Sequence, residues 1–378
     1  PRARRVSGLA AFACLAAVLA SAQPAAVMSS PIAGAIESAV LGETRPFWVS
    51  LPDEYEASGE PYAVVYLLDG ELNFTSGVVG GLRYAASLGE IPELIVVGIK
   101  NTDRSKDIFP EVVTYQDGSQ DGGRANQFLD FIASELVPYV DAHYRTQGYR
   151  VLYGTSNTGF TVIHALFTRP RLATATVAAS ATLSIKSFIE KRDDLIRGLD
   201  GGKRQLVMVN GENDLPTVLT HTSALKERID ILAPAGLGCR LSVVAHGGHV
   251  PPSAFLTGMR CLFEGWPAEA ELTADSFEEV FARADRRLAS FGVAANPREG
   301  DLQALHGKLL GAGKAVESLT VARFWARSHP RSAAALVATG DSHARLGETE
   351  AARESYRQGL RLDPANTAAN GRLQQLGT

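Results

Sequence analysis

The chain has few aromatic residues and few cysteines, and it carries almost no excess charge of either sign. Aromatic side chains make up 7% of the 378 residues, and the three cysteines include no C-x-x-C pair. So few cysteines exclude a disulfide scaffold, although spacing alone does not decide whether Cys239 and Cys261 pair. The formal net charge of −4 offers no basic face for nucleic acid or anionic membrane. With 45% hydrophobic and 21% charged residues, the composition is that of a folded globular protein.

The N-terminal segment has the pattern of a secretory signal peptide. Arginines within residues 2–5 precede an almost wholly apolar run, residues 6–19, and Ala-Ser-Ala follows at 20–22. The apolar run is short for a membrane span. We expect residues 1–22 to be cleaved off, which leaves no stable membrane span and an exported protein, periplasmic or secreted. An uncleaved anchor is the alternative.

Residues 30–267 alternate short β-branched runs with amphipathic segments, which predicts an α/β domain. The helical face of residues 127–139 is the clearest of the amphipathic segments. Strands buried on both faces and separated by helices predict a mostly parallel sheet covered by helices on both faces. Ligands bind such sheets beyond the carboxyl ends of the strands. The predicted strands are residues 64–68, 94–99, 150–153, 175–178, 206–209 and 241–244.

Residues 268–378 have helical spacing and no strand pattern. Gly313 and Gly347 are 34 residues apart, as are Pro330 and Pro364, which is the period of the tetratricopeptide repeat. We expect these helices to dock on the α/β domain or on a second subunit, because so few repeats do not stand alone. The predicted packing positions of the second unit are Leu336, Gly340, Gly347, Ala352, Tyr356, Gly359 and Pro364.

A serine follows the third predicted strand. Gly154-Thr155-Ser156-Asn157-Thr158-Gly159 leads into an apolar helical segment, residues 160–167. A serine on a sharp strand-to-helix turn exposes its Oγ, and amides at the helix N-terminus can stabilise an oxyanion. The match to G-x-S-x-G is imperfect, because Thr158 occupies the place of the second glycine. Ser156 is the candidate nucleophile.

Acidic residues and then histidines follow the last two predicted strands, in the order that a hydrolase nucleophile on such a sheet needs. We favour Asp214 as the acid for its offset from the strand and its glycine, and Glu212 stays open as the alternative. We favour His249 as the base because two preceding glycines let the loop turn back, and His246 stays open. Histidines three apart could bind a metal, but no third ligand at suitable spacing is visible, so we expect no metal.

The segment after the first predicted strand offers a second oxyanion donor. It reads Leu68-Asp69-Gly70-Glu71. We expect the oxyanion hole to consist of the backbone N–H groups of Glu71 and Asn157. Asp69 is expected to brace this loop rather than to take part in the chemistry.

Several blocks of sequence occur in a specific order: residues 62–70, 96–107, 128–146 ending in Tyr-Arg-Thr, and the Ser156 turn. In that order they resemble the esterase family related to esterase D, the enterobactin-type siderophore esterases and S-formylglutathione hydrolase. The resemblance covers roughly residues 36–265. It implies an α/β-hydrolase fold, a Ser-acid-His triad and ester hydrolysis without a cofactor. Members with a tetratricopeptide-like C-terminal extension belong to the same group.

The resemblance carries over to individual residues unevenly. Ser156 matches the family nucleophile directly, Asp214 matches by its offset from a glycine, and His249 matches less cleanly because the following segment is short. The family commonly has Gly-His-Ser-Phe-Gly-Gly at the nucleophile, and its Ser-Pro-Ser-Leu-Trp block is replaced here by residues 180–184. Aromatic walls of the usual pocket are therefore lost, and a β-branched Thr158 could weaken the turn.

We therefore expect an exported serine esterase that cleaves a carboxylic ester through an acyl-enzyme on Ser156, with no cofactor. Its partner would be a small-molecule ester and not nucleic acid. The C-terminal helices could add a homodimer or a protein contact. The alternative is a catalytically degenerate α/β-hydrolase that serves as a binding or scaffold module through those helices.

Overall fold

The computed structural model describes residues 30–115, 117–266 and 278–377. The predicted signal segment, residues 1–22, and the predicted boundary between residues 267 and 268 lie outside the described residues, so cleavage and export stay predictions. Within the described ranges, no helix combines the length and the apolar character that a membrane span requires.

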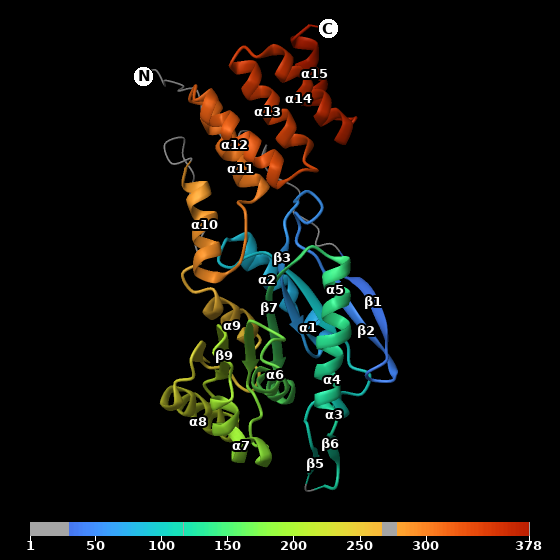
Figure 1. The fold of residues 1–378 in the computed structure, drawn as a ribbon, viewed down its shortest axis with the longest axis vertical. Helices are drawn as coiled ribbons and strands as arrows, with labels where there is room; N and C mark the ends of the chain where they lie inside the picture. Colours follow the sequence, from blue (N-terminus) through green and yellow to red (C-terminus); the bar gives the residue numbers. More distant parts are fainter. Residues whose placement is uncertain (1–29, 116, 267–277, 378) are drawn as a thin grey trace, which may run out of the picture.

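The described residues contain one large sheet, in the order β1-β2-β4-β3-β7-β8-β9-β10 (Figure 1). Neighbouring strands from β4 to β10 are parallel, whereas β1–β2 and β2–β4 are antiparallel. The mostly parallel sheet is therefore as predicted. The strands are β1 (Ile32–Ser38), β2 (Glu43–Ser50), β3 (Tyr62–Leu67), β4 (Leu94–Ile99), β7 (Thr146–Thr155), β8 (Ala175–Ala179), β9 (Arg204–Gly211) and β10 (Leu237–Val244).

Two features of the sheet differ from the prediction. Strands β1 and β2 were not predicted, because β1 is rich in small residues and β2 mixes charged residues with Pro46. Strand β10 was expected to be buried on both faces, but it is the edge strand and is only partly covered. Its apolar run alone does not distinguish an edge strand from a central one.

Helices cover both faces of the sheet, as predicted. Alternate residues of each strand point to opposite faces. Val64 and Tyr66 of β3 pack in one core with Phe160, whereas Val65 and Leu67 pack in a second core with Leu82 and Phe255. The predicted helix at residues 127–139 lies within the continuous run of α4, the π-helical η1 and α5. The helices are α1 (Gly70–Thr75), α2 (Val78–Ser87), α3 (Arg104–Asp107), α4 (Ala125–Phe131), η1 (Ile132–Leu136), α5 (Val137–His143), α6 (Ser156–Thr168), α7 (Lys186–Arg197), α8 (Pro216–Leu232) and α9 (Ala254–Leu262).

The described C-terminal residues are all-helical, as predicted. Helices α11, α13 and α15 begin at Glu299, Ala333 and Thr367, which repeats the 34-residue period of the sequence. Of the predicted packing residues, Gly340, Ala352, Tyr356 and Gly359 are buried, and the tetratricopeptide assignment itself stays a prediction. The helices are α10 (Glu279–Phe291), α11 (Glu299–Gly311), α12 (Ala315–Ser328), α13 (Ala333–Arg345), α14 (Thr349–Leu362) and α15 (Thr367–Gln375).

The C-terminal helices dock on the amino ends of the parallel strands. The N–H of Gly59, shortly before β3, donates to the carbonyl of Ser328 at 3.0 Å. The carboxylate of Glu54 accepts hydrogen bonds from the first backbone N–H of α11, at Glu299. In Figure 1 these helices lie at one end of the molecule, and the hairpin of β5 (Val112–Thr114) and β6 (Gln120–Gly122) projects at the other. The carboxyl ends of the parallel strands thus face away from the C-terminal helices.

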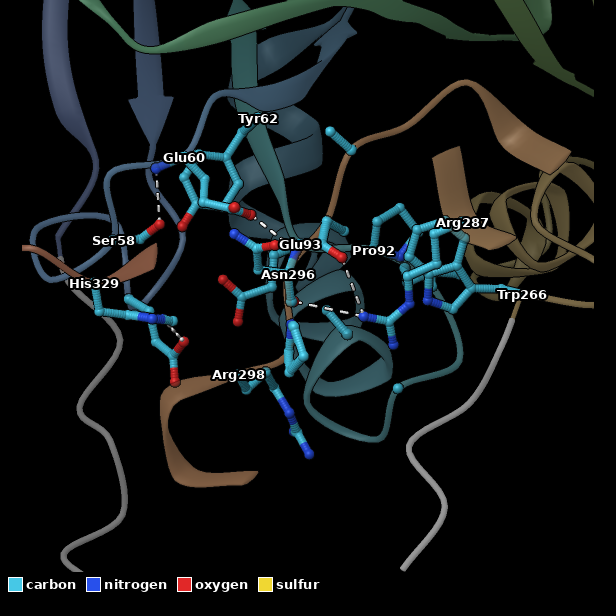
Figure 2. A pocket seen from close by; sticks show the side chains of 17 residues that line it. Ser58, Glu60, Tyr62, Pro92, Glu93, Trp266, Arg287, Asn296, Arg298 and His329 are labelled. Atoms are coloured by element: carbon cyan, nitrogen blue, oxygen red, sulfur yellow. Dashed lines mark hydrogen bonds and ion pairs between the residues drawn. The ribbon is translucent and has the colours of Figure 1, made fainter. Parts of the chain in front are cut away.

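A cavity at this contact is lined by several carboxylates and basic groups, among them Glu60, Glu93, Arg298 and His329 (Figure 2). Burial, together with the nearby carboxylates of Glu54 and Asp53, raises the pKa of Glu93 to about 7. The positive charges of Arg83 and Arg298 act in the opposite direction but do not cancel these effects. Glu93 is therefore protonated in the folded state at mildly acidic pH.

We expect Glu93→Gln to change how the unfolding temperature depends on pH. The folded-state pKa of about 7 exceeds the ordinary value of 4.5, so the folded protein binds this proton more tightly than the unfolded chain does. The resulting stabilisation is fully present below pH 4.5 and is lost as the pH rises through 7. Glutamine stays neutral, so the variant should be more stable than the unmodified protein at pH 8, by up to about 3 kcal/mol. Thermal unfolding between pH 4.5 and 8 measures this, with the exposed Glu227→Gln as the control. Parallel curves for E93Q and the unmodified protein would contradict it.

Candidate functional site

Ser156 lies on a sharp turn between β7 and α6. It is the first residue of α6, directly after the last residue of β7, and its φ of 52° lies in the left-handed region. Non-glycine residues adopt this conformation rarely, and it recurs at functional sites. The turn needs Gly154, because a Cβ there would lie 2.2 Å from the carbonyl oxygen of Thr158. The half-buried Ser156 is thus presented at the carboxyl end of a central strand.

The structure brings Ser156, His249 and Asp214 together in one hydrogen-bonded chain. Nε2 of His249 lies 3.0 Å from Oγ of Ser156, and Nδ1 of His249 lies 2.7 Å from Oδ1 of Asp214. The three residues follow β7, β10 and β9, so they meet beyond the carboxyl ends of these strands. This is the arrangement in which a histidine can take the serine proton while the acid orients the ring.

The loops after β9 and β10 pack against each other, and this contact places the acid and the histidine. The N–H of Asn213 donates to the carbonyl of Gly247 at 2.8 Å. Position 211 accommodates only glycine, because a Cβ on Gly211 would lie 2.1 Å from the carbonyl oxygen of Gly248. The two glycines before His249 therefore lie where the β9 loop passes closely, which brings Asp214 next to the His249 ring.

Asp214 is held as an anion. Burial acts to raise the pKa of Asp214, but four hydrogen bonds outweigh burial and lower the pKa below its ordinary value. An anionic acid can retain the Nδ1–H of the histidine and stabilise the imidazolium that forms when the ring accepts a proton. The donors are the Ser180 Oγ at 2.5 Å, the His249 ring at 2.7 Å, and the backbone N–H groups of Leu215 at 2.8 Å and Gly211 at 3.2 Å.

The two alternative residues contact each other and lie apart from this chain. The backbone N–H of His246 donates to Oε2 of Glu212 at 2.7 Å, and the His246 side chain is 96% exposed.

Among the described residues, no group of three His, Cys, Asp or Glu side chains is arranged to hold a metal ion. Cys239 and Cys261 are both free thiols.

The predicted oxyanion residues lie at the ends of two adjacent strands. Asn157 is the second residue of α6, after β7, and Glu71 is the second residue of the short helix α1, after β3. The carboxylate of Glu71 accepts hydrogen bonds from the backbone N–H and Nδ2 of Asn101, at 3.1 and 3.0 Å. Asp69 is buried at φ 53° and is bonded by Arg104 and Asn101, so it braces this loop as expected.

Ser180 is a site residue that the sequence analysis missed. In the sequence, Ser180 stood out only as part of residues 180–184, which replace the family's Ser-Pro-Ser-Leu-Trp block. The structure places it directly after β8, fully buried, with φ 48°. Its Oγ donates to Asp214 and accepts the backbone N–H of Val250 at 2.9 Å, so it links the acid to the histidine loop. Its place after a central strand was the available signal.

Known proteins resemble this chain in sequence and in fold. The family described as Putative esterase matches residues 38–234. The siderophore triacetylfusarinine C esterase of Aspergillus fumigatus is 30% identical over 174 residues, which are 40% of this chain and 59% of that protein. The chain thus spans less than two thirds of the length of this relative.

Two solved structures share the fold. The IroE-like serine hydrolase of Shewanella oneidensis is 27% identical, with a TM-score of 0.66, and the match covers 78% of this chain and 99% of that one. An uncharacterised protein from Capnocytophaga ochracea has a TM-score of 0.57 at 14% identity, over 92% of this chain and 99% of that one. The second match extends the likeness in fold over most of the chain. The family match covers more than half of the chain. Together with the structural matches, it shows that this chain belongs to the Putative esterase family and has the α/β-hydrolase fold.

Proposed function

We propose that this protein hydrolyses a carboxylic ester through an acyl-enzyme on Ser156. The observation that carries the proposal is the hydrogen-bonded chain from Oγ of Ser156 through His249 to Asp214. The match to the esterase family and the likeness to a siderophore esterase support the same reaction class.

In the first half of the reaction, Nε2 of His249 accepts the proton of Ser156 as Oγ attacks the ester carbonyl carbon. The carbonyl oxygen becomes an oxyanion, which the backbone N–H groups of Asn157 and Glu71 would receive. Asp214 holds the opposite side of the ring and stabilises the imidazolium. When the tetrahedral intermediate collapses, the C–O bond to the alcohol breaks and the leaving oxygen takes the proton from His249.

In the second half, water replaces the alcohol. His249 accepts a proton from the water as the water oxygen attacks the acyl carbon. The proton then returns to Oγ of Ser156 as the carboxylic acid product leaves. Every proton transfer passes through the His249 ring. Apart from the ester and water, these steps use only residues of this chain.

Two exposed apolar residues directly follow site residues in the chain and are candidates for contact with an apolar part of the ester. Leu72 directly follows Glu71, and Leu215 directly follows Asp214, and their side chains are 58% and 51% exposed. Exposed apolar residues next to a site are suited to apolar ligand surface. Because the similar protein from Aspergillus fumigatus is named for a siderophore ester, such esters are the first natural substrates to test after p-nitrophenyl esters.

A fluorophosphonate probe tests the proposal directly. Such probes phosphonylate a serine Oγ that a neighbouring base activates. We expect covalent labelling of the unmodified protein, mapped by peptide mass spectrometry to Ser156, and no labelling of Ser156→Ala. Absence of labelling from folded protein would favour the alternative, a degenerate hydrolase that serves as a binding module through its C-terminal helices.

A further inference from the structure

Thr158 departs from the usual nucleophile turn, which has glycine at this place, and the structure gives its side chain a specific contact. Thr158 lies in the first turn of α6 and is buried. Its Oγ1 accepts the backbone N–H of Thr155 at 2.9 Å. Its single proton has two acceptors within reach, Oδ2 of Asp69 at 2.8 Å and the carbonyl of Thr155 at 2.9 Å. A carboxylate is the stronger acceptor, so the hydroxyl donates to Asp69.

Asp69 extends this contact to the loop after β3. Its carboxylate also accepts Nε of Arg104 at 2.7 Å and Nδ2 of Asn101 at 2.8 Å. The same Asn101 amide group donates to Oε1 of Glu71 at 3.0 Å. A chain of charged and polar hydrogen bonds therefore runs from the helix that begins with Ser156 to the loop that contains Glu71.

The two N–H groups assigned to the oxyanion hole belong to separate segments. Asn157 precedes Thr158 in α6, whereas Glu71 lies two residues after Asp69 in the loop that begins α1. Stabilisation of an oxyanion requires both donors at a fixed separation, because preorganised donors need no rearrangement during the reaction. Glycine at position 158 would have no side chain with which to join the two segments.

We infer that Thr158 is a positioning residue whose hydrogen bond to Asp69 sets the separation of the two oxyanion donors. This inference rests on the proposed esterase function and adds a specific determinant to it. Where the family has a flexible glycine, this chain has Thr158, whose side chain forms a hydrogen bond to Asp69. Thr158 is buried and its Oγ1 bonds to Thr155 and Asp69 rather than to Ser156 or His249, so its effect is exerted through the segment that contains Asp69 and Glu71.

The test compares Thr158→Val, Thr158→Ser and Thr161→Val in p-nitrophenyl ester hydrolysis. Valine keeps the shape of threonine and removes the hydroxyl, so kcat should fall by about 10- to 100-fold with KM changed by less than about threefold. Serine retains the hydroxyl, so T158S should recover most of kcat. Thr161 is the matched control, because it is a buried threonine of the same helix whose Oγ1 donates instead to the carbonyl of Ile108. T161V should lower the unfolding temperature and leave kcat within about twofold.

Asp69→Asn tests the same bond from its other end without altering α6. If Thr158 and Asp69 act as one unit, the double variant T158V/D69N should have a kcat no lower than the worse single variant. The inference would be overturned if the kcat losses of the two single variants multiplied in the double variant. It would also be overturned by a T158V variant with unchanged kcat, or by a loss in T158V that T158S fails to recover.

Ser156→Ala, assayed alongside, separates the two proposals. Turnover that does not depend on Ser156 overturns the proposed function and the inference with it, whereas Ser156-dependent turnover unaffected by T158V overturns the inference alone.

Discussion

Replacing Ser156 with alanine is expected to reduce the turnover of p-nitrophenyl esters by about four to six orders of magnitude, as in other enzymes that lose a catalytic serine. The reason is chemical: without Oγ no acyl-enzyme forms, and only the oxyanion donors and substrate binding remain to assist attack by water. Initial rates at saturating substrate, together with burst kinetics, measure the loss.

The control for this variant is Ser134→Ala. Ser134 lies in η1, is exposed, and its Oγ donates to the carbonyl of Asp130. We expect S134A to hydrolyse the ester at the rate of the unmodified protein. Full activity in folded S156A would refute the assignment of the nucleophile, whatever the behaviour of the control.

Replacing His249 with alanine is expected to cost a similar factor, about four to six orders of magnitude in kcat, because the serine loses its base. His246→Ala is the matched control, since both histidines lie on the same loop, three positions apart. The His249 ring bridges Ser156 and Asp214, whereas the His246 ring is directed to solvent beside Glu212. We therefore expect H246A to keep kcat within about twofold.

The outcome for the two histidines also decides between the two acids. Activity retained in H249A and lost in H246A would assign the chemistry to the pair of His246 and Glu212. The structure argues for the first assignment, because Asp214 is buried and receives four hydrogen bonds, whereas Glu212 is exposed. A buried, bonded carboxylate can orient a ring, and an exposed one is free to move away from it.

The position of the C-terminal helices bears on the alternative function. They contact the segment that leads into β3, through Glu54 and Gly59, and therefore lie at the amino ends of the strands. Ser156 and His249 follow the carboxyl ends of β7 and β10, at the opposite end of the strands. A partner bound to these helices would thus leave the triad open. Catalysis and binding through the helices are compatible in this architecture.

Much of the fold could be predicted from local pattern. The β4 prediction, residues 94–99, coincides with the observed strand, and the predicted helix at 127–139 lies within the run from α4 to α5. Both segments are strongly periodic or uniformly β-branched, so local preference and burial act together. Strands β1 and β2 have no such pattern. They pair with each other as an antiparallel hairpin, and β2 also pairs with β4, which is a long-range contact.

The sequence by itself determined the candidate residues and their order along the chain: Ser156 after a strand and before a helix, then two acids, then two histidines. Chain order follows from local pattern, so it can be read without coordinates. Only the tertiary structure decided which acid and which histidine meet the serine, because that choice depends on the close packing of Gly211 against Gly248. The bond between Thr158 and Asp69 likewise joins residues 89 positions apart. Contacts at such separation are set by how strands pair in the sheet, and local preference carries no information about them.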